Sequence, residues 1–110
     1  MREVFIAIAA LLLMTACSSS PPEFEIVGRS ASDSEPFGDY TVRVECDLRN
    51  GGGSGRVTVT ASVDAQNGAW TKRQASVIDE GESRAFTFVF TEVEYQLLGD
   101  NSFEYNCGLE

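Results

Sequence analysis

Apolar and polar side chains alternate without a break from Tyr40 to Arg49. Successive side chains of a β-strand point to opposite faces, so this period of two predicts a strand with one buried face and one exposed face. Cys46 lies in phase with Val42, Val44 and Leu48, on the apolar side. The segment therefore predicts a half-buried strand that carries a cysteine into the core.

Four later segments also have strand character, and turn signals rich in Gly, Asn and Asp separate them. They are Arg56–Asp64, Trp70–Ile78, Ala85–Thr91 and Phe103–Leu109. The first, third and fourth alternate clearly, and the last places Cys107 on its apolar side. Alternation is poor in Trp70–Ile78, which predicts an edge strand.

Two further segments complete the expected organisation. Phe24–Val27 is interpreted as a first strand before the polar stretch Gly28–Gly38, and Tyr95–Leu98 as a short strand or a helical turn. Helical periodicity is missing outside the N-terminal segment. Several short strands between turns favour an all-β, antiparallel β-sandwich of about six to seven strands over residues 24–110.

The N-terminal segment has the pattern of an export signal. Arg2 precedes an apolar run of 11 residues, Val4–Met14, and Thr15-Ala16 then precedes Cys17. A helix that spans a membrane needs about 20 apolar residues, so this run favours a cleaved signal over residues 1–16. Residues 17–23 are rich in Ser and Pro, which is typical of a flexible tether.

The motif Leu13-Met14-Thr15-Ala16-Cys17 resembles the lipobox of bacterial lipoproteins. The resemblance implies cleavage before Cys17, acylation of its sulfur and of the new amino end, and attachment to a membrane through these chains. Ser18 after the cysteine is similar to the pattern that sorts such proteins to the outer membrane. The alternative is an ordinary secretory signal in which Cys17 has no role.

If Cys17 is acylated, Cys46 and Cys107 remain to pair with each other. Export places both in a compartment where disulfides persist, and both are predicted to face the core. Closing a loop of 61 residues would stabilise the domain by about 4 kcal/mol. The alternatives are a metal pair, a redox couple or two free thiols, which the missing C-x-x-C spacing and the absence of histidine disfavour.

The spacing of Cys46 and Cys107 is similar to that of the cysteines that bridge the two sheets of immunoglobulin domains. Tyr105, two residues before the second cysteine, matches their tyrosine-corner position. The resemblance implies an immunoglobulin-like sandwich with one inter-sheet disulfide. A final strand after Cys107 is not expected, so either Phe24–Val27 replaces it or an exposed edge could accept a partner's strand.

A narrower resemblance covers about residues 40–108. The alternating Val42–Gly51 and Gly55–Val59, followed by Gly81-Glu82-Ser83 and three alternating phenylalanines, resemble the bacterial CARDB and FxLYD-type sandwich modules of surface proteins. These are signatures of turns and core positions, so they imply a fold and no particular ligand.

Composition excludes several classes of function. The chain carries 17 acidic and 8 basic residues, a net charge of −9, whereas nucleic-acid binding requires clustered Lys and Arg. The absence of histidine removes the usual catalytic triads and most zinc sites. The run Asn50–Gly55 lacks the Lys and Ser/Thr of a phosphate-binding loop and is interpreted as a hairpin loop whose glycines accept positive φ. We expect neither enzymatic activity nor a cofactor.

Two groups of residues are candidates for binding. Trp70, followed by Thr71-Lys72-Arg73-Gln74, is either an exposed aromatic anchor or a core residue. Asp79, Glu80 and Glu82 form an acidic turn that is either a calcium site or simply solvated, and their spacing does not match an EF-hand.

The sequence thus predicts a non-catalytic, lipid-anchored cell-envelope module that contacts a protein or a polysaccharide. We expect it to be attached to the membrane through acyl chains on Cys17 and to bind no nucleic acid. The alternative function is a small periplasmic inhibitor or ligand-carrying lipoprotein that acts on an envelope enzyme.

Overall fold

The computed structural model describes residues 20–35, 38–95 and 101–110. The predicted signal over residues 1–16 and the candidate lipid site Cys17 lie outside them. Six strands occur in the described residues: β1 (Phe24–Ser34), β2 (Thr41–Asn50), β3 (Gly55–Ala65), β4 (Gly68–Ile78), β5 (Ser83–Phe90) and β6 (Glu104–Leu109). Within the same residues, no helix has the length and apolar character that crossing a membrane requires.

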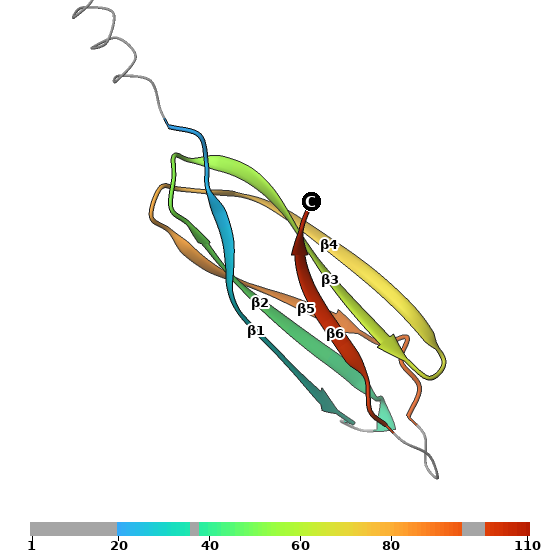
Figure 1. The fold of residues 1–110 in the computed structure, drawn as a ribbon. Coiled ribbons are helices and arrows are strands. Elements are labelled where there is room, and N and C mark those ends of the chain that lie inside the picture. Colours follow the sequence, from blue (N-terminus) through green and yellow to red (C-terminus); the bar gives the residue numbers. More distant parts are fainter. Residues whose placement is uncertain (1–19, 36–37, 96–100) are drawn as a thin grey trace, which may run out of the picture.

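The strands form two three-stranded sheets that pack face to face (Figure 1). The strand order is β1-β2-β5 in one sheet and β4-β3-β6 in the other, and all neighbours are antiparallel. This arrangement confirms the predicted all-β sandwich. It also confirms the segment from Trp70 to Ile78 as part of an edge strand, β4.

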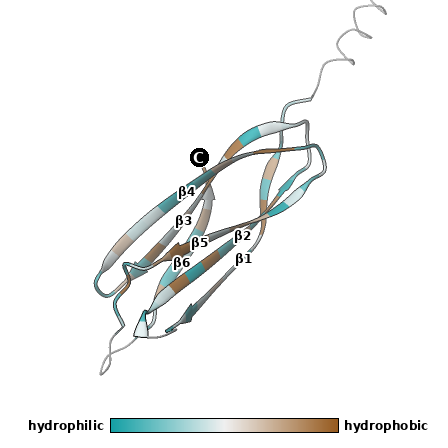
Figure 2. Ribbon diagram, turned by 180° about the vertical axis from the view of Figure 1, so that it is seen from behind, coloured by the Kyte–Doolittle hydropathy of each residue, from teal (hydrophilic) through white to brown (hydrophobic). Residues whose placement is uncertain are grey.

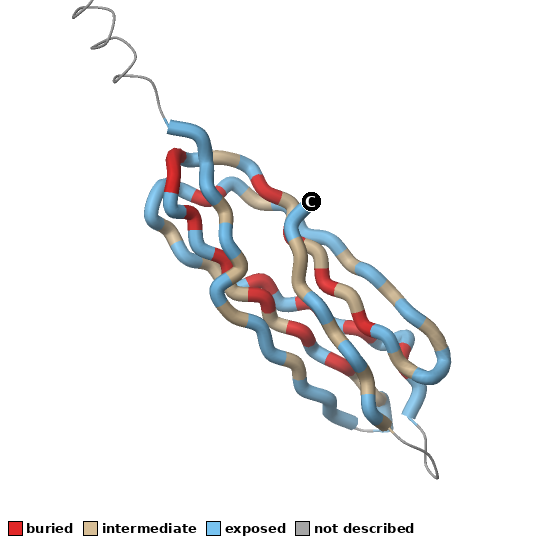
Figure 3. Tube along the Cα trace, viewed as in Figure 1, coloured by how far each residue is buried: buried red, intermediate tan, exposed pale blue. Residues whose placement is uncertain are grey.

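The core lies between the sheets and is built from the inward positions of β2, β3 and β5 (Figures 2 and 3). Its buried side chains on these strands are Val42, Val44, Cys46, Leu48, Val57, Val59, Ala61, Val63, Phe86, Phe88 and Phe90. Each large apolar side chain removed from water contributes about 1.5–3 kcal/mol. The alternation seen in the sequence therefore identified the correct face of all three strands.

A disulfide joins Cys46 of β2 to Cys107 of β6 and so bridges the two sheets, as predicted. The Cα atoms are 5.9 Å apart and the bond closes a loop of 61 residues. Cys46 is fully buried, whereas Cys107 is half-buried because β6 lies at the edge of its sheet.

The first strand is longer than predicted. The polar stretch that begins at Gly28 was expected to leave the sheet, but β1 continues to Ser34 and pairs with β2 along its whole length. The register shifts between Ile26 and Gly28, which interrupts the apolar alternation that would have revealed the strand. Of the predicted element Tyr95–Leu98, only Tyr95 is described, and it lies outside any strand.

The interpretation of Asn50–Gly55 as a hairpin loop is wrong. β2 and β3 lie in different sheets, so residues 51–54 cross from one sheet to the other. The described glycines with positive φ are Gly38, Gly68 and Gly81, so none of them lies in this loop. The tight hairpin is the one between β3 and β4, where Gly68 follows the turn at Gln66-Asn67.

Candidate functional site

Trp70 is half-buried on β4 and packs against the core cluster. Lys72 and Arg73, the two cations that follow it in the sequence, form hydrogen bonds and ion pairs with other residues. Lys72 Nζ donates to the carbonyl oxygen of Val89 at 2.9 Å, and it lies 3.3 Å from a carboxylate oxygen of Glu92. Arg73 pairs with Glu110 at 2.7 Å. The structure thus places Trp70 in the packing between the sheets, without gathering a cationic patch around it.

The acidic turn after β4 is organised by its own hydrogen bonds. The backbone N–H of Asp79 donates to Glu82 Oε1 at 2.8 Å, and Arg84 contacts Glu82 Oε2 at 2.6 Å. The hydrogen bond from Asp79 and then the Arg84 guanidinium lower the pKa of Glu82. In the described residues, no three acidic or cysteine side chains converge in a way that could hold a metal ion. The geometry gives the calcium interpretation of Asp79, Glu80 and Glu82 no support.

Asn50 is a residue whose importance the sequence did not reveal. Its side chain is fully buried at the end of β2, where three segments of the chain meet. Its Oδ1 accepts hydrogen bonds from the backbone N–H groups of Glu23 and Gly52, at 3.1 and 3.0 Å. Its Nδ2 lies 2.8, 3.1 and 3.3 Å from the carbonyl oxygens of Gly53, Ile78 and Asp79. One amide therefore ties the N-terminal segment, the crossing loop and the end of β4 together.

The last part of the predicted tether, Ser20–Glu23, lies against this crossing loop. Gly51 and Gly53 donate backbone hydrogen bonds to the carbonyl oxygens of Glu23 and Pro21, at 2.8 and 3.1 Å. A Cβ atom on Gly53 would lie 2.0 Å from the carbonyl oxygen of Ser20. Gly53 thus allows the N-terminal segment to approach the loop more closely than any side chain at this position would permit.

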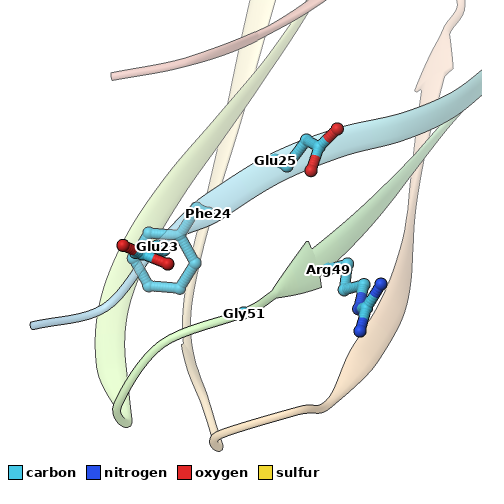
Figure 4. Close-up of a pocket in the computed structure, with 5 residues that line it drawn as sticks. All are labelled: Glu23, Phe24, Glu25, Arg49 and Gly51. Carbon is cyan, nitrogen blue, oxygen red and sulfur yellow. The ribbon is translucent and has the colours of Figure 1, made fainter. Parts of the chain in front are cut away.

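A hollow at this end of the sandwich is lined by Glu23, Phe24, Glu25, Arg49 and Gly51 (Figure 4). Glu25 of β1 and Arg49 of β2 stand opposite each other in the sheet. The hollow is bordered by the docked N-terminal segment. It is therefore a feature of the junction between this segment and the sandwich.

A second cleft, of about 710 Å³, lies at the other end of the sandwich, between residues 38–41 and the segment that follows β5. The rings of Tyr40 and Tyr95 meet there with their centroids 5.5 Å apart. The hydroxyl of Tyr40 donates to Asp33 Oδ2 at 2.8 Å. Burial and then this hydrogen bond raise the pKa of Tyr40 to about 12.

This distal cleft combines aromatic surface with hydrogen-bonding groups. Tyr95 is 45 % exposed. Asp39, Glu94, Thr41 and Thr91 line the same cleft. Rings beside carboxylate and hydroxyl acceptors can hold a ligand through stacking and hydrogen bonds, and the carboxylates would repel an anionic one.

The chain matches no known protein-family model, and no curated protein sequence matches it. The likeness to CARDB and FxLYD-type modules therefore stays a resemblance in core and turn positions. Neither Asn50 nor the pair of tyrosines was singled out as a site by sequence reasoning. An asparagine just before a glycine run signals a turn, but burial and contacts between distant segments decide its role here.

Proposed function

We propose that the protein is a non-catalytic, lipid-anchored module of the cell envelope that contacts a protein or a polysaccharide through its distal cleft. The inter-sheet disulfide indicates an extracytoplasmic protein, because such bonds persist in oxidising compartments. The lipobox-like motif before Cys17 supports an anchor at the amino end of the mature chain.

The observation that carries the proposal is that the N-terminal segment and the distal cleft lie at opposite poles of the sandwich. Residues 20–23 are held at one pole of the sandwich, beside the crossing loop and the turn between β4 and β5 (Figure 1). The aromatic cleft lies at the opposite pole, where β1 ends and β2 begins. An anchor at Cys17 would thus direct the cleft away from the membrane, towards other components of the envelope.

The anchor is tested on the full-length protein in its native envelope. Extraction with detergent and intact-mass measurement should give residues 17–110 plus acyl chains, and Cys17→Ala should abolish both acylation and membrane retention. An unacylated, freely diffusing wild-type chain would refute the anchor.

Binding by the cleft is tested separately, with purified protein and isolated envelope glycans. Tyr95→Ala should reduce retention on the glycans, whereas Val77→Ala, which removes an exposed side chain near the opposite pole, should not. Equal retention of both variants would refute the role of the cleft. If the wild type instead co-purifies with an envelope hydrolase and inhibits it, the alternative function, a periplasmic inhibitor, is favoured.

A further inference from the structure

We propose that the free edge of β6 docks an extended segment of another protein, which adds to the sheet beside β6. The inference goes beyond the proposed function, because it depends neither on an acyl anchor nor on the distal cleft. In the described part of the chain, β6 pairs with β3 on one side and with no strand on the other.

The register identifies the backbone groups that face this free edge. The N–H of Glu110 donates to the carbonyl oxygen of Thr58 at 3.0 Å, which fixes the hydrogen-bonded pairs of the β3–β6 ladder. Hydrogen-bonded and non-bonded pairs alternate along antiparallel strands. The backbone groups of Tyr105, Cys107 and Leu109 therefore point away from β3, in the arrangement that an added strand would need.

The opposite flank of the sandwich is closed by side chains that reach across from β4. Lys72 donates to the carbonyl oxygen of Val89, and Gln74 Nε2 donates to that of Thr87 at 2.6 Å, so outward carbonyls of β5 are occupied. The charges of Lys72 and Arg73 also protect β4, since lysine and arginine on an edge discourage pairing. The edge of β1 is interrupted by its register shift after Ile26.

The surroundings of β6 indicate the chemistry of the added segment. Asp64 and Glu104 stand directly opposite each other and are both exposed, although like charges at such positions destabilise a sheet. A hollow beside them is completed by Ser62, Tyr105 and Asn106. A lysine or arginine from an added strand would relieve the repulsion. On the other face of β6, which points toward the opposite sheet, Leu109 is 42 % exposed and offers an apolar contact.

Arg29 of β1 occupies the approach to this edge. Its Nη1 donates to Asn106 Oδ1 at 2.7 Å, and its guanidinium carbon lies 5.6 Å from the centre of the Tyr105 ring. The side chain thus passes over the edge of β6 between its two faces. An incoming strand would have to displace it, so Arg29 limits access to the edge.

The test uses a synthetic peptide that alternates lysine and valine, and it measures amide hydrogen exchange by NMR. Without peptide, the amides of Tyr105, Cys107 and Leu109 should exchange faster than those of Asn106 and Gly108. Adding the peptide at about ten times its Kd should slow the exchange of the Tyr105, Cys107 and Leu109 amides about tenfold. Arg29→Ala should tighten binding, whereas Arg43→Ala, a matched change at an exposed arginine of β2, should not.

Leu109→Pro provides the decisive variant, because it removes an outward N–H while the ladder to β3 stays intact. It should weaken peptide binding and leave the exchange of the β3 amides unchanged. The proposal is overturned if no saturable binding occurs to wild type or Arg29→Ala, if Leu109→Pro binds equally, or if β4 is protected instead. Protection of the same amides by self-association without peptide would assign the edge to a second copy of the chain and overturn the choice of partner.

Discussion

Replacing Asn50 by aspartate should strongly destabilise the domain, although the two side chains have nearly the same shape. The variant keeps an oxygen in place of Oδ1, which still accepts from Glu23 and Gly52. The Nδ2 donor becomes a second oxygen, which then faces the carbonyl oxygens of Gly53, Ile78 and Asp79. The variant Asn50→Asp therefore removes the donors and adds a negative charge at a site with no exposure to solvent.

The loss in free energy of unfolding can be worked out from these contacts. A buried carbonyl that loses its donor costs about 1–3 kcal/mol, so the loss of two or three donors costs about 2–9 kcal/mol. Domains of this size are stable by about 5–15 kcal/mol, so the variant would lose a large fraction of its free energy of unfolding. Burial and the facing carbonyls raise the pKa of the introduced carboxyl in the folded state.

The raised pKa gives the effect a pH dependence of known sign. Above the carboxyl pKa of the unfolded chain, about 3.9, the folded variant binds more protons than the unfolded one, so its stability falls as pH rises. The penalty relative to wild type should be largest at pH 7 and should shrink on acidification, when the protonated carboxyl can donate one hydrogen bond. Asn50→Ala should show no such difference between pH values.

Urea unfolding at pH 7 and at pH 4, followed by circular dichroism, measures both effects. The matched control is Asn67→Asp, the same chemical change at an exposed turn where Nδ2 donates to the carbonyl oxygen of Glu92. This control should lose less than about 1 kcal/mol, because water can replace the lost donor. A loss of similar size in both variants, or an Asn50→Asp penalty that does not depend on pH, would show that the buried amide does not hold the three segments together.

Three further changes test separate parts of the structure. Replacing both bridged cysteines by alanine should cost about 4 kcal/mol through the 61-residue loop and lower the thermal midpoint by roughly 20 °C; an unchanged midpoint would mean that the bond contributes nothing. Absorbance titration should show Tyr40 ionising near pH 12, with the stability due to its raised pKa lost as pH rises from about 10 to 12. Asp33→Asn should lower that pKa only in part, since burial is the larger cause. Gly53→Ala should remove the amide protection that its N–H gains from the N-terminal segment, whereas Gly51→Ala, whose added Cβ would lie 3.9 Å from the nearest atom, should be tolerated.

The sandwich was predictable because its strands carry a strong local signal. In β2 and β3 every inward position except Asn50 is apolar or a glycine, and the same phase placed Cys46 and Cys107 on inward faces. Once both cysteines face one core and are the only pair left, their bond follows. β1 lacked this signal, because an edge strand has little to bury and its register shifts after Ile26.

The candidate sites were less predictable because they depend on contacts between segments far apart in the sequence. Asn50 lies 27 residues from Glu23 and 28 from Ile78, and only the fold brings them together. Tyr40 was expected inside a strand, yet it lies just before β2 and meets Tyr95 across the distal cleft. The glycines after Asn50 were interpreted as hairpin glycines with positive φ, which the structure does not bear out. Their cause is close approach of another backbone, which has no local sequence pattern.

The docked segment also affects how an anchored domain would be held. If Cys17 carries the acyl chains, three peptide units separate it from Ser20, a reach of at most about 11 Å. The hydrogen bonds of Gly51, Gly53 and Asn50 to the segment then keep the N-terminal pole near the headgroups. Releasing the segment would add four residues to the tether and let the domain rotate. The crossing loop would therefore control the direction in which the distal cleft and the β6 edge face, and so which partners in the envelope they can reach.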